Sequence, residues 1–449
     1  MIKSKIIILF IILVFLLSIS SCTAEIEPNE IVTEEKDKDK EASPPIETEV
    51  TNKENYEFDT IENTYVSLDK IGGRLIGTDS NYLFAKELKN YMNKNYKDAE
   101  LNSQPYKINL TKKYEVNIST EENIITFNEK NSICKYINKS KLNEKDLLVT
   151  NSLENLKRNS NYIYFTEDES SIEESKNYDN VYISLLVVDE IFLGQNTIKV
   201  KTEIPTIMNI DINISEQLKE LLNKSVELNI DIENEELELE NIFAVVKGKE
   251  SRNAVVITSH YDSTTAKGNN YSKGAIDNGS GVSLNLSLLK KIYDNAKIYN
   301  YDVIFAFVNS EEGFLLKSTS GSMQLNNYLT EKYEKVLNVN LDCLGEKNIK
   351  VLNYGMDGNL NVSELDNIIL TETKEMFSSE KVDYYTSDNI SFENNIYFYN
   401  FDYHGESRAI HTERDNLAIV DIDMLEKLSN VIYEILVQIL NTDASLIFK

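Results

Sequence analysis

The second half of the chain alternates strand-like and helix-like runs, and this alternation limits the folds that it can adopt. From Asn241 onward, four mostly apolar runs have the length of buried strands, at 254–258, 303–308, 336–341 and 396–401. Apolar residues recur between and after them at helical spacing: Val282, Leu286, Leu289 and Tyr293, then Leu425, Leu428, Ile432, Ile435 and Ile439. We therefore predict an α/β fold with a mostly parallel, mixed sheet flanked by helices.

The region from 105 to 236 has a different character. It offers short, β-branched segments at 162–165, 181–188 and 197–201 and one predicted helix near 215–223, without a concentration of catalytic residue types. A chain of 449 residues is also too long for one ordinary hydrophobic core. We predict that this region is a β-rich domain inserted into the α/β fold.

The N-terminus has the features of an export signal. Lys3 and Lys5 precede an apolar run at 6–17, and the following ISSC sequence resembles a bacterial lipobox with cleavage before Cys22. We expect an exported protein with a diacylglycerol on Cys22, anchored to the outer face of the bacterial cell membrane. A plain secretory signal with an incidental cysteine is the competing interpretation. Residues 23–56, rich in Glu, Lys, Asp, Thr and Pro, predict a disordered tether.

Charge and cysteine content exclude two classes of protein. A formal net charge of -28 argues against nucleic acid as a partner, because phosphate binding needs clustered Lys and Arg. Besides Cys22, only Cys134 and Cys343 remain, far apart in sequence. They do not predict a disulfide scaffold.

Five short motifs in the second half carry acidic residues or histidines. They are SHYDS at 259–263, GAIDNGSGV at 274–282, NSEEGF at 309–314, NLDCLG at 340–345 and IHTERD at 410–415. Two of the three histidines of the chain, His260 and His411, lie in these motifs, and His404 does not. Imidazoles and carboxylates in this number are what two divalent cations need for hydrolysis at neutral pH.

Most of the candidate ligands follow a predicted strand. His260 comes after 254–258, Glu311 and Glu312 after 303–308, Asp342 after 336–341, and His411 after the fourth strand. Ligands of open α/β sheets bind outside the carboxyl ends of the strands. We therefore expect these distant residues to converge at one edge of the sheet.

The five motifs and the strands between them resemble the M28 family of zinc aminopeptidases. RLIGTDSNYLFAKEL at 74–88 is similar to the start of that family's catalytic domain, and the β-rich region looks like its protease-associated insert. The resemblance implies the zinc-dependent exopeptidase fold. The predicted divisions are a signal peptide at 1–21, a tether at 22–56, peptidase domain at 57–104 and 237–449, and the β-rich insert at 105–236.

The resemblance also implies roles for individual residues and two Zn²⁺ ions per chain, with peptides as substrates. Asp277 would bridge the two metals. His260 and Asp342 would complete the ligands of one ion, and Glu312 and His411 those of the other. Glu311 would be the general base, and the Asp262 carboxylate would accept a hydrogen bond from the metal-free nitrogen of His260.

The chain departs from the family pattern in three places. The loop after Glu312 is longer, Asn389 stands where many members have a histidine, and Ile410 stands where many have a tyrosine that helps to stabilise the tetrahedral intermediate. Loss of such a donor costs on the order of a hundredfold in rate.

Other residues carry weaker expectations. Gly279 and Gly281 are expected to let the backbone turn sharply into the next helix. Asp415 either orients His411 or caps the following segment. Asp388 and Phe392 belong either to the substrate pocket or to a surface turn, and His404 is expected at the pocket rim or the surface.

Three alternatives to a di-zinc aminopeptidase stay open. A glutaminyl cyclase shares the fold and a similar HYDS motif but uses one zinc ion. A non-catalytic surface binding protein on this fold would typically lack some ligands, whereas here all five and the base are present. A carboxypeptidase or dipeptidase would keep the same site and differ in the charge of its pocket.

Overall fold

The computed structural model describes residues 55–449, with gaps at 129–130, 138–139, 155, 189–198, 201–204, 250–251, 265–271, 313–319 and 402–408. The predicted signal peptide, Cys22, nearly all of the predicted tether, His404 and most of the longer loop after Glu312 lie outside the described residues. In the part of the chain that is described, no helix combines the length and hydrophobicity that a membrane span requires.

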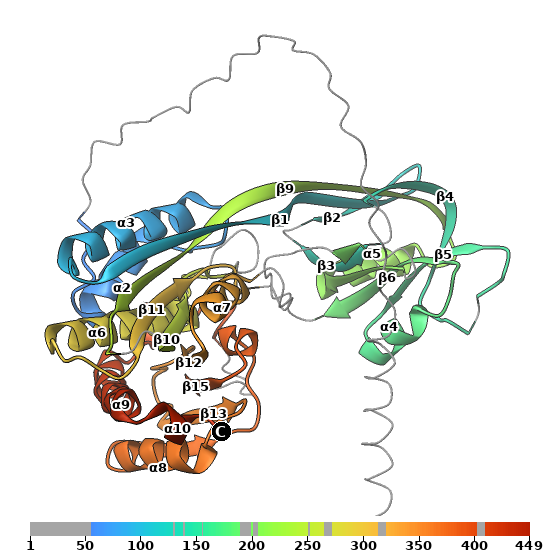
Figure 1. The fold of residues 1–449 in the computed structure, drawn as a ribbon. Coiled ribbons are helices and arrows are strands. Elements are labelled where there is room, and N and C mark those ends of the chain that lie inside the picture. Colours follow the sequence, from blue (N-terminus) through green and yellow to red (C-terminus); the bar gives the residue numbers. More distant parts are fainter. Residues whose placement is uncertain are drawn as a thin grey trace, which may run out of the picture. The chain divides into compact units, whose positions relative to one another are not determined.

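The strands predicted in the second half form a mixed sheet (Figure 1). Its strands are β9 (Ser225–Val246), β10 (Asn253–His260), β11 (Asp302–Val308), β12 (Lys335–Leu341), β13 (Val351–Asp357), β14 (Ser378–Lys381) and β15 (Asn395–Tyr399), in the order β14-β13-β15-β12-β10-β11-β9. β10 pairs in parallel with β11 and β12, and β12 with β15, whereas β9 and β13 are antiparallel to their neighbours β11 and β15. The predicted α/β fold with a mostly parallel, mixed sheet is confirmed.

Helices cover both faces of this sheet. They are α2 (Ile61–Ile71), α3 (Asp79–Asn95), α6 (Gly281–Asp294), α7 (Gly321–Lys332), α8 (Val362–Thr373), α9 (Ile422–Asn441) and α10 (Ala444–Ile447), with the single turns η2 (Ala275–Ser280), η3 (Asp388–Ser391) and η4 (Leu417–Ile419). Successive residues of β10 point to opposite faces. Val255 and Ile257 belong to the core that contains α6 and α9, and Val256 packs in the core that contains Leu325 and Leu329 of α7.

The long C-terminal helix α9 follows the predicted apolar spacing. Its buried residues include Leu425, Leu428 and Ile432, all completely inaccessible to solvent. The side chain of Asp421 begins the helix by accepting a hydrogen bond from the backbone N–H of Met424. A carboxylate at this position satisfies one of the free N–H groups of the first turn, so the sequence determines both where α9 begins and which face is buried.

The region between α3 and β10 forms a second group of strands with its own core. It contains β1 (Glu100–Ser119), β2 (Ile124–Asn128), β3 (Ser132–Ile137), β4 (Lys141–Thr150), β5 (Asn161–Thr166), β6 (Val181–Val188), β7 (Lys199–Val200) and β8 (Thr206–Asp211), with α4 (Glu169–Ser175) and α5 (Ile212–Glu220). β4, β5, β6 and β8 run parallel to their neighbours in that order. The predicted segments at 162–165 and 181–188 are strands, and α5 overlaps the predicted helix.

The two longest strands pass through the expected limits of the insert. β1 and β9 pair in antiparallel register from Glu100 opposite Val245 to Ser119 opposite Glu227 (Figure 1). This ladder includes positions on both sides of 104 and of 236, where the sequence pattern divides the chain. The ladder therefore joins the insert to the α/β sheet through backbone hydrogen bonds.

Candidate metal centre

Three strand ends bring candidate ligands to the same edge of the sheet. His260 is the last residue of β10 and pairs with Val308, the last residue of β11. Glu311 and Glu312 lie just beyond β11, and Asp342 directly follows β12. Because these strands are parallel, their carboxyl ends meet, as the sequence predicted.

The fourth element of the site is η2, the turn that leads into α6 and carries Asp277. The expectation that Gly279 and Gly281 supply a sharp backbone turn is wrong, because neither has a positive φ; the left-handed residue is Gly274, with φ of 56°. A Cβ on Gly281 would lie 2.3 Å from the carbonyl oxygen of Leu341. Gly281 is therefore needed for close packing of η2 against the end of β12.

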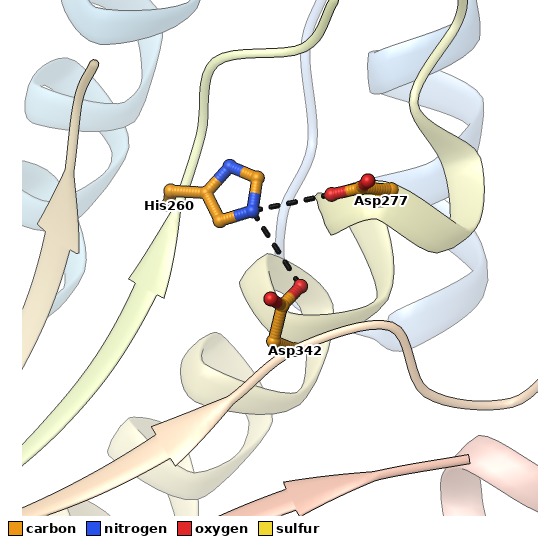
Figure 2. Close-up of side chains that lie close together, drawn as sticks. All are labelled: His260, Asp277 and Asp342. Carbon is orange, nitrogen blue, oxygen red and sulfur yellow. Dashed lines mark ion pairs between the residues drawn. The ribbon is translucent and has the colours of Figure 1, made fainter. Parts of the chain in front are cut away.

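Asp277 stands between the two histidines and offers one carboxylate oxygen to each. Its Oδ1 lies 3.2 Å from His260 Nε2, which is also 3.5 Å from Asp342 Oδ1 (Figure 2). Its Oδ2 lies 2.9 Å from His411 Nε2, which is 3.2 Å from Glu312 Oε2. The five side chains thus form two groups of three that share Asp277, and in each group the candidate ligand atoms lie within 4.8 Å of one another.

The adjacent glutamates point to different parts of the site. Glu312 belongs to the His411 group, whereas Glu311 Oε2 lies 3.8 Å from His260 Nε2 and is in neither group of three. The side chain of Glu311 is 21% exposed and that of His411 29%, compared with 0% for His260. Solvent therefore reaches the centre from the side of Glu311 and His411.

The site concentrates negative charge in a buried place. Burial alone would lower the pKa of His260, but Glu311 and three aspartates raise it well above its ordinary value. Burial together with nearby Asp277 raises the pKa of Glu312 to about 7. Burial and the neighbouring carboxylates also raise the pKa of Glu311. A raised pKa means that the group binds a proton more readily than usual. The three shifts therefore indicate that this buried group of side chains favours additional positive charge.

The chemistry of these side chains fits a metal centre. His260 Nε2, Glu312 Oε1 and Asp342 Oδ1 are buried and have no hydrogen-bond partner among the residues that the structure describes. An unpartnered buried polar atom costs free energy unless a ligand satisfies it. Imidazole nitrogen and carboxylate oxygen are ordinary ligands of zinc, so the two groups of three are suited to hold one cation each, with Asp277 shared.

Asp262 contacts His260 and also fixes the glutamates. The backbone carbonyl oxygen of Asp262 lies 3.2 Å from His260 Nδ1, and its carboxylate Oδ1 lies 3.6 Å away. The carboxylate also accepts the backbone N–H groups of Glu311 and Glu312, at 3.2 Å and 3.0 Å. The Asp262 carboxylate therefore fixes the turn after β11. Asp262 also faces His260 Nδ1, the ring nitrogen that points away from the candidate metal site.

Two residues of the site have no role in the sequence-based prediction. The hydroxyl of Tyr385 donates to Asp342 Oδ2 at 3.1 Å, and its ring stacks on Tyr399 with centroids 4.4 Å apart. Arg74 is completely buried, and its guanidinium donates to backbone carbonyls of the loops that carry His260 and Asp277. Arg74 lies in the RLIGTDS segment and Tyr385 lies just before SDNISF, so both were near recognised motifs.

Asp415 performs neither of its two expected roles. Its carboxylate accepts the backbone N–H groups of Ile276 and Asp277, at 2.7 Å and 3.2 Å. The side chain is completely buried. Asp415 thus fixes the backbone of η2 next to the shared ligand.

The departures from the family pattern have structural consequences. Ile410 is 5% exposed and packs into the main core, so this position offers the site no polar group. Asn389 is buried and holds the turn before η3, accepting the N–H of Ser387 and donating to the carbonyl of Tyr385. Asp388 and Phe392 are 1% and 4% exposed, so they do not form a surface turn.

Three non-glycine residues at the centre have left-handed backbone conformations. Ser310, just before Glu311, has φ of 59°, Cys343, just after Asp342, has φ of 52°, and His411 itself has φ of 62°. Such conformations are costly for residues with a Cβ and gather at functional sites. Their position around the ligands supports a functional role for this edge of the sheet.

Comparisons with known proteins agree with this description. Residues 241–436 match the sequence profile of peptidase family M28. Among solved structures, BSAP, a zinc aminopeptidase from Bacillus subtilis, shares the fold with a TM-score of 0.65 and 18% identity, over 88% of this chain and 99% of that one. An aminopeptidase from Aneurinibacillus sp. strain AM-1 matches with a TM-score of 0.57 and 15% identity, over 87% and 96%. A search of curated proteins finds no match.

Proposed function

The chain belongs to peptidase family M28 through residues 241–436, and from this premise we propose that it is a di-zinc aminopeptidase. The observation that carries the proposal is the position of Asp277, whose two carboxylate oxygens face two separate groups of ligands. His260 and Asp342 would hold one zinc ion, Glu312 and His411 the other, and Asp277 both. When bound, zinc acidifies water and polarises a carbonyl group.

The protein's own contribution to catalysis rests on Glu311. Its carboxylate is partly open to solvent, close to His260, and outside both ligand groups. We assign to it the proton transfers of hydrolysis: it takes a proton from the attacking water and delivers that proton to the nitrogen of the leaving amine. Burial raises its pKa, which makes its carboxylate a stronger base than an exposed glutamate.

The charges around the centre favour an amino terminus over a carboxyl terminus as the group recognised. Glu311, Glu312 and Asp342 surround the site, and the nearby guanidinium of Arg74 is engaged by three backbone carbonyls. With zinc bound, the Glu311 carboxylate, which is outside both ligand groups, would attract a free α-ammonium group and repel a free α-carboxylate.

The two complete ligand groups also distinguish the proposal from its alternatives. A glutaminyl cyclase with one zinc ion needs only one group of ligands, yet in this chain two groups of three candidate ligands are brought together. A non-catalytic binding protein has no use for the general base, and Glu311 lies beside the ligands.

Hydrolysis of small substrates tests the proposed function. The zinc-loaded chain is expected to release p-nitroaniline from L-aminoacyl anilides but not from the same anilides with an acetylated amino group. Glu311→Gln is expected to retain its zinc and to lose about 100-fold or more in kcat, because it cannot accept a proton. Unchanged turnover in this variant would contradict the role of Glu311. Cyclisation of N-terminal glutamine without hydrolysis would favour the cyclase instead.

A further inference from the structure

Two buried charged side chains that are not candidate ligands lie on either side of the segment that carries Asp277. Arg74 comes from the segment between α2 and α3, and Asp415 lies four residues after His411; both are completely buried. Burying a charge is costly unless it is well compensated by hydrogen bonds or an opposite charge. Their hydrogen bonds therefore indicate what these charges hold in place.

Arg74 joins the His260 strand end to the segment before Asp277. Its Nε donates to the carbonyl of Tyr261 at 2.7 Å, and its two terminal nitrogens donate to the carbonyls of Lys273 and Gly274 at 2.8 and 2.9 Å. The backbone N–H of Arg74 also donates to the hydroxyl of Ser263. The planar guanidinium thus connects the residue directly after His260 to a segment that lies three to four residues before Asp277.

Asp415 makes the complementary contacts from the other side. Its carboxylate accepts the N–H groups of Ile276 and Asp277, whereas Arg74 donates to carbonyls of the same segment two to four residues earlier. Within 273–277, carbonyl oxygens therefore accept hydrogen bonds from the Arg74 guanidinium, and backbone N–H groups donate to the Asp415 carboxylate. Because Asp415 belongs to the segment of His411, it ties Asp277 to the second histidine.

We propose that Arg74 and Asp415 act together as positioning residues that fix Asp277 relative to both histidines and so preorganise the two metal sites. This inference rests on the proposed di-zinc function. The two residues touch no substrate. Together they determine the distance between the shared carboxylate and the two imidazoles. We call this pair of positioning residues the clamp. If the clamp fixes Asp277, then changing Arg74 or Asp415 should weaken the binding of metal.

Metal affinity of the full chain tests the clamp directly. The metal-free protein is titrated with Zn²⁺ against a chromophoric chelator, for the wild type, Arg74→Met, Asp415→Asn and the double variant. Each single variant is expected to weaken zinc binding by about 10- to 100-fold, the range seen when outer residues that orient ligands are changed. The double variant is expected to lose less than the product of the two single losses, because both residues hold one segment.

Asp302→Asn is the matched control. Asp302 is also completely buried and also accepts a backbone N–H, that of Gly248 at 2.9 Å, but it begins β11 at the opposite end of that strand. This variant is expected to lower the thermal stability and to leave zinc affinity unchanged. Arg74→Lys keeps the charge without the planar fork and is expected to recover part of the affinity lost in Arg74→Met.

The outcomes separate the clamp from the proposed function. Wild-type zinc affinity in Asp415→Asn, with a loss of stability like that of Asp302→Asn, would overturn the clamp while leaving the di-zinc site intact. A wild type that binds no zinc would instead overturn the proposed function. Asp415→Asn is nearly isosteric with the native residue, so it decides the question even if Arg74→Met does not fold.

Discussion

The α/β sheet and the β-rich insert both contain four parallel strands in a row, yet acidic residues after those strands serve different purposes. In the insert, Asp168 follows β5 and Asp211 ends β8; each begins a helix by accepting backbone N–H groups of the next turn. In the α/β sheet, Glu312 and Asp342 follow β11 and β12 and turn toward histidines from other elements. A carboxylate after a strand is therefore a weak indication of a site when taken alone.

What separates these strand-end carboxylates is the fate of their oxygens. The Asp211 carboxylate is satisfied within its own helix turn. By contrast, Asp342 and Glu312 each keep one buried oxygen without a hydrogen-bond partner among the described residues. Local capping stabilises a fold, whereas convergence of unsatisfied ligands from distant segments requires a bound group. Four substitutions, from the largest expected effect to the smallest, test this difference.

Removal of the shared ligand is expected to have the largest effect. Asp277→Ala deletes the carboxylate that faces both histidines. We expect the zinc content to fall below one ion per chain. We also expect the rate of hydrolysis to fall by more than the roughly 10- to 100-fold that is typical when a residue that only orients a metal ligand is changed. Zinc analysis and an anilide assay on the same sample measure both. Retention of two zinc ions would show that Asp277 does not bridge them.

Truncation in the core of the insert is expected to affect stability alone. Ile183 of β6 is completely buried in the core of the insert. Ile183→Ala should lower the free energy of unfolding by about 2–5 kcal/mol, through lost burial and the cavity left behind. Chemical denaturation measures this loss. Zinc content and kcat of the folded fraction should stay at wild-type values, and a fall in zinc content would show that the insert contributes to the metal sites.

Asp388 gives the metal-free protein a pH dependence. Burial raises the pKa of this carboxyl to about 7 from an ordinary value of 3.8. Its contribution to stability is complete below pH 3.8 and is lost as the pH rises through 7, because ionisation is easier in the unfolded chain.

Asp388→Asn removes this titration. Between pH 5 and pH 7, the stability of the metal-free variant relative to metal-free wild type is expected to increase by roughly 2 kcal/mol. Urea unfolding across this pH range measures the difference. A difference that stays constant with pH would show that Asp388 is already ionised in the folded protein.

The smallest effect is expected for the helix cap of the insert. Asp211→Ala removes the acceptor for the N–H of Asn213 and should lower the stability by about 1 kcal/mol. Thermal unfolding followed by circular dichroism detects such a change. Hydrolysis should be unaffected; a loss of activity would mean that this strand-end carboxylate also serves the site.

The strands and the ligands could be predicted from the sequence because both follow from the burial of apolar runs in a parallel sheet. A short, continuous apolar run such as 303–308 is typical of a strand buried on both faces, and the structure makes that run part of β11. Parallel strands then bring His260 and Asp342 together whatever the loops between them do.

The supporting residues could not be predicted in the same way. Arg74 and Asp415 act on backbone groups about 187 and 139 positions away, and such contacts leave no periodicity in the sequence. Asn389 shows the same limit: its side chain stabilises a local turn next to Tyr385, which the sequence pattern did not indicate. These residues are recognisable only when the segments that they join are seen together.

Zinc stoichiometry tests the central claim most directly. The full chain, stripped of metal and reloaded with a small excess of Zn²⁺, is desalted and measured for zinc and protein by mass spectrometry and amino-acid analysis. Two groups of ligands sharing Asp277 predict close to two zinc ions per chain. One zinc ion per chain, unchanged in Glu312→Ala, would contradict the shared site.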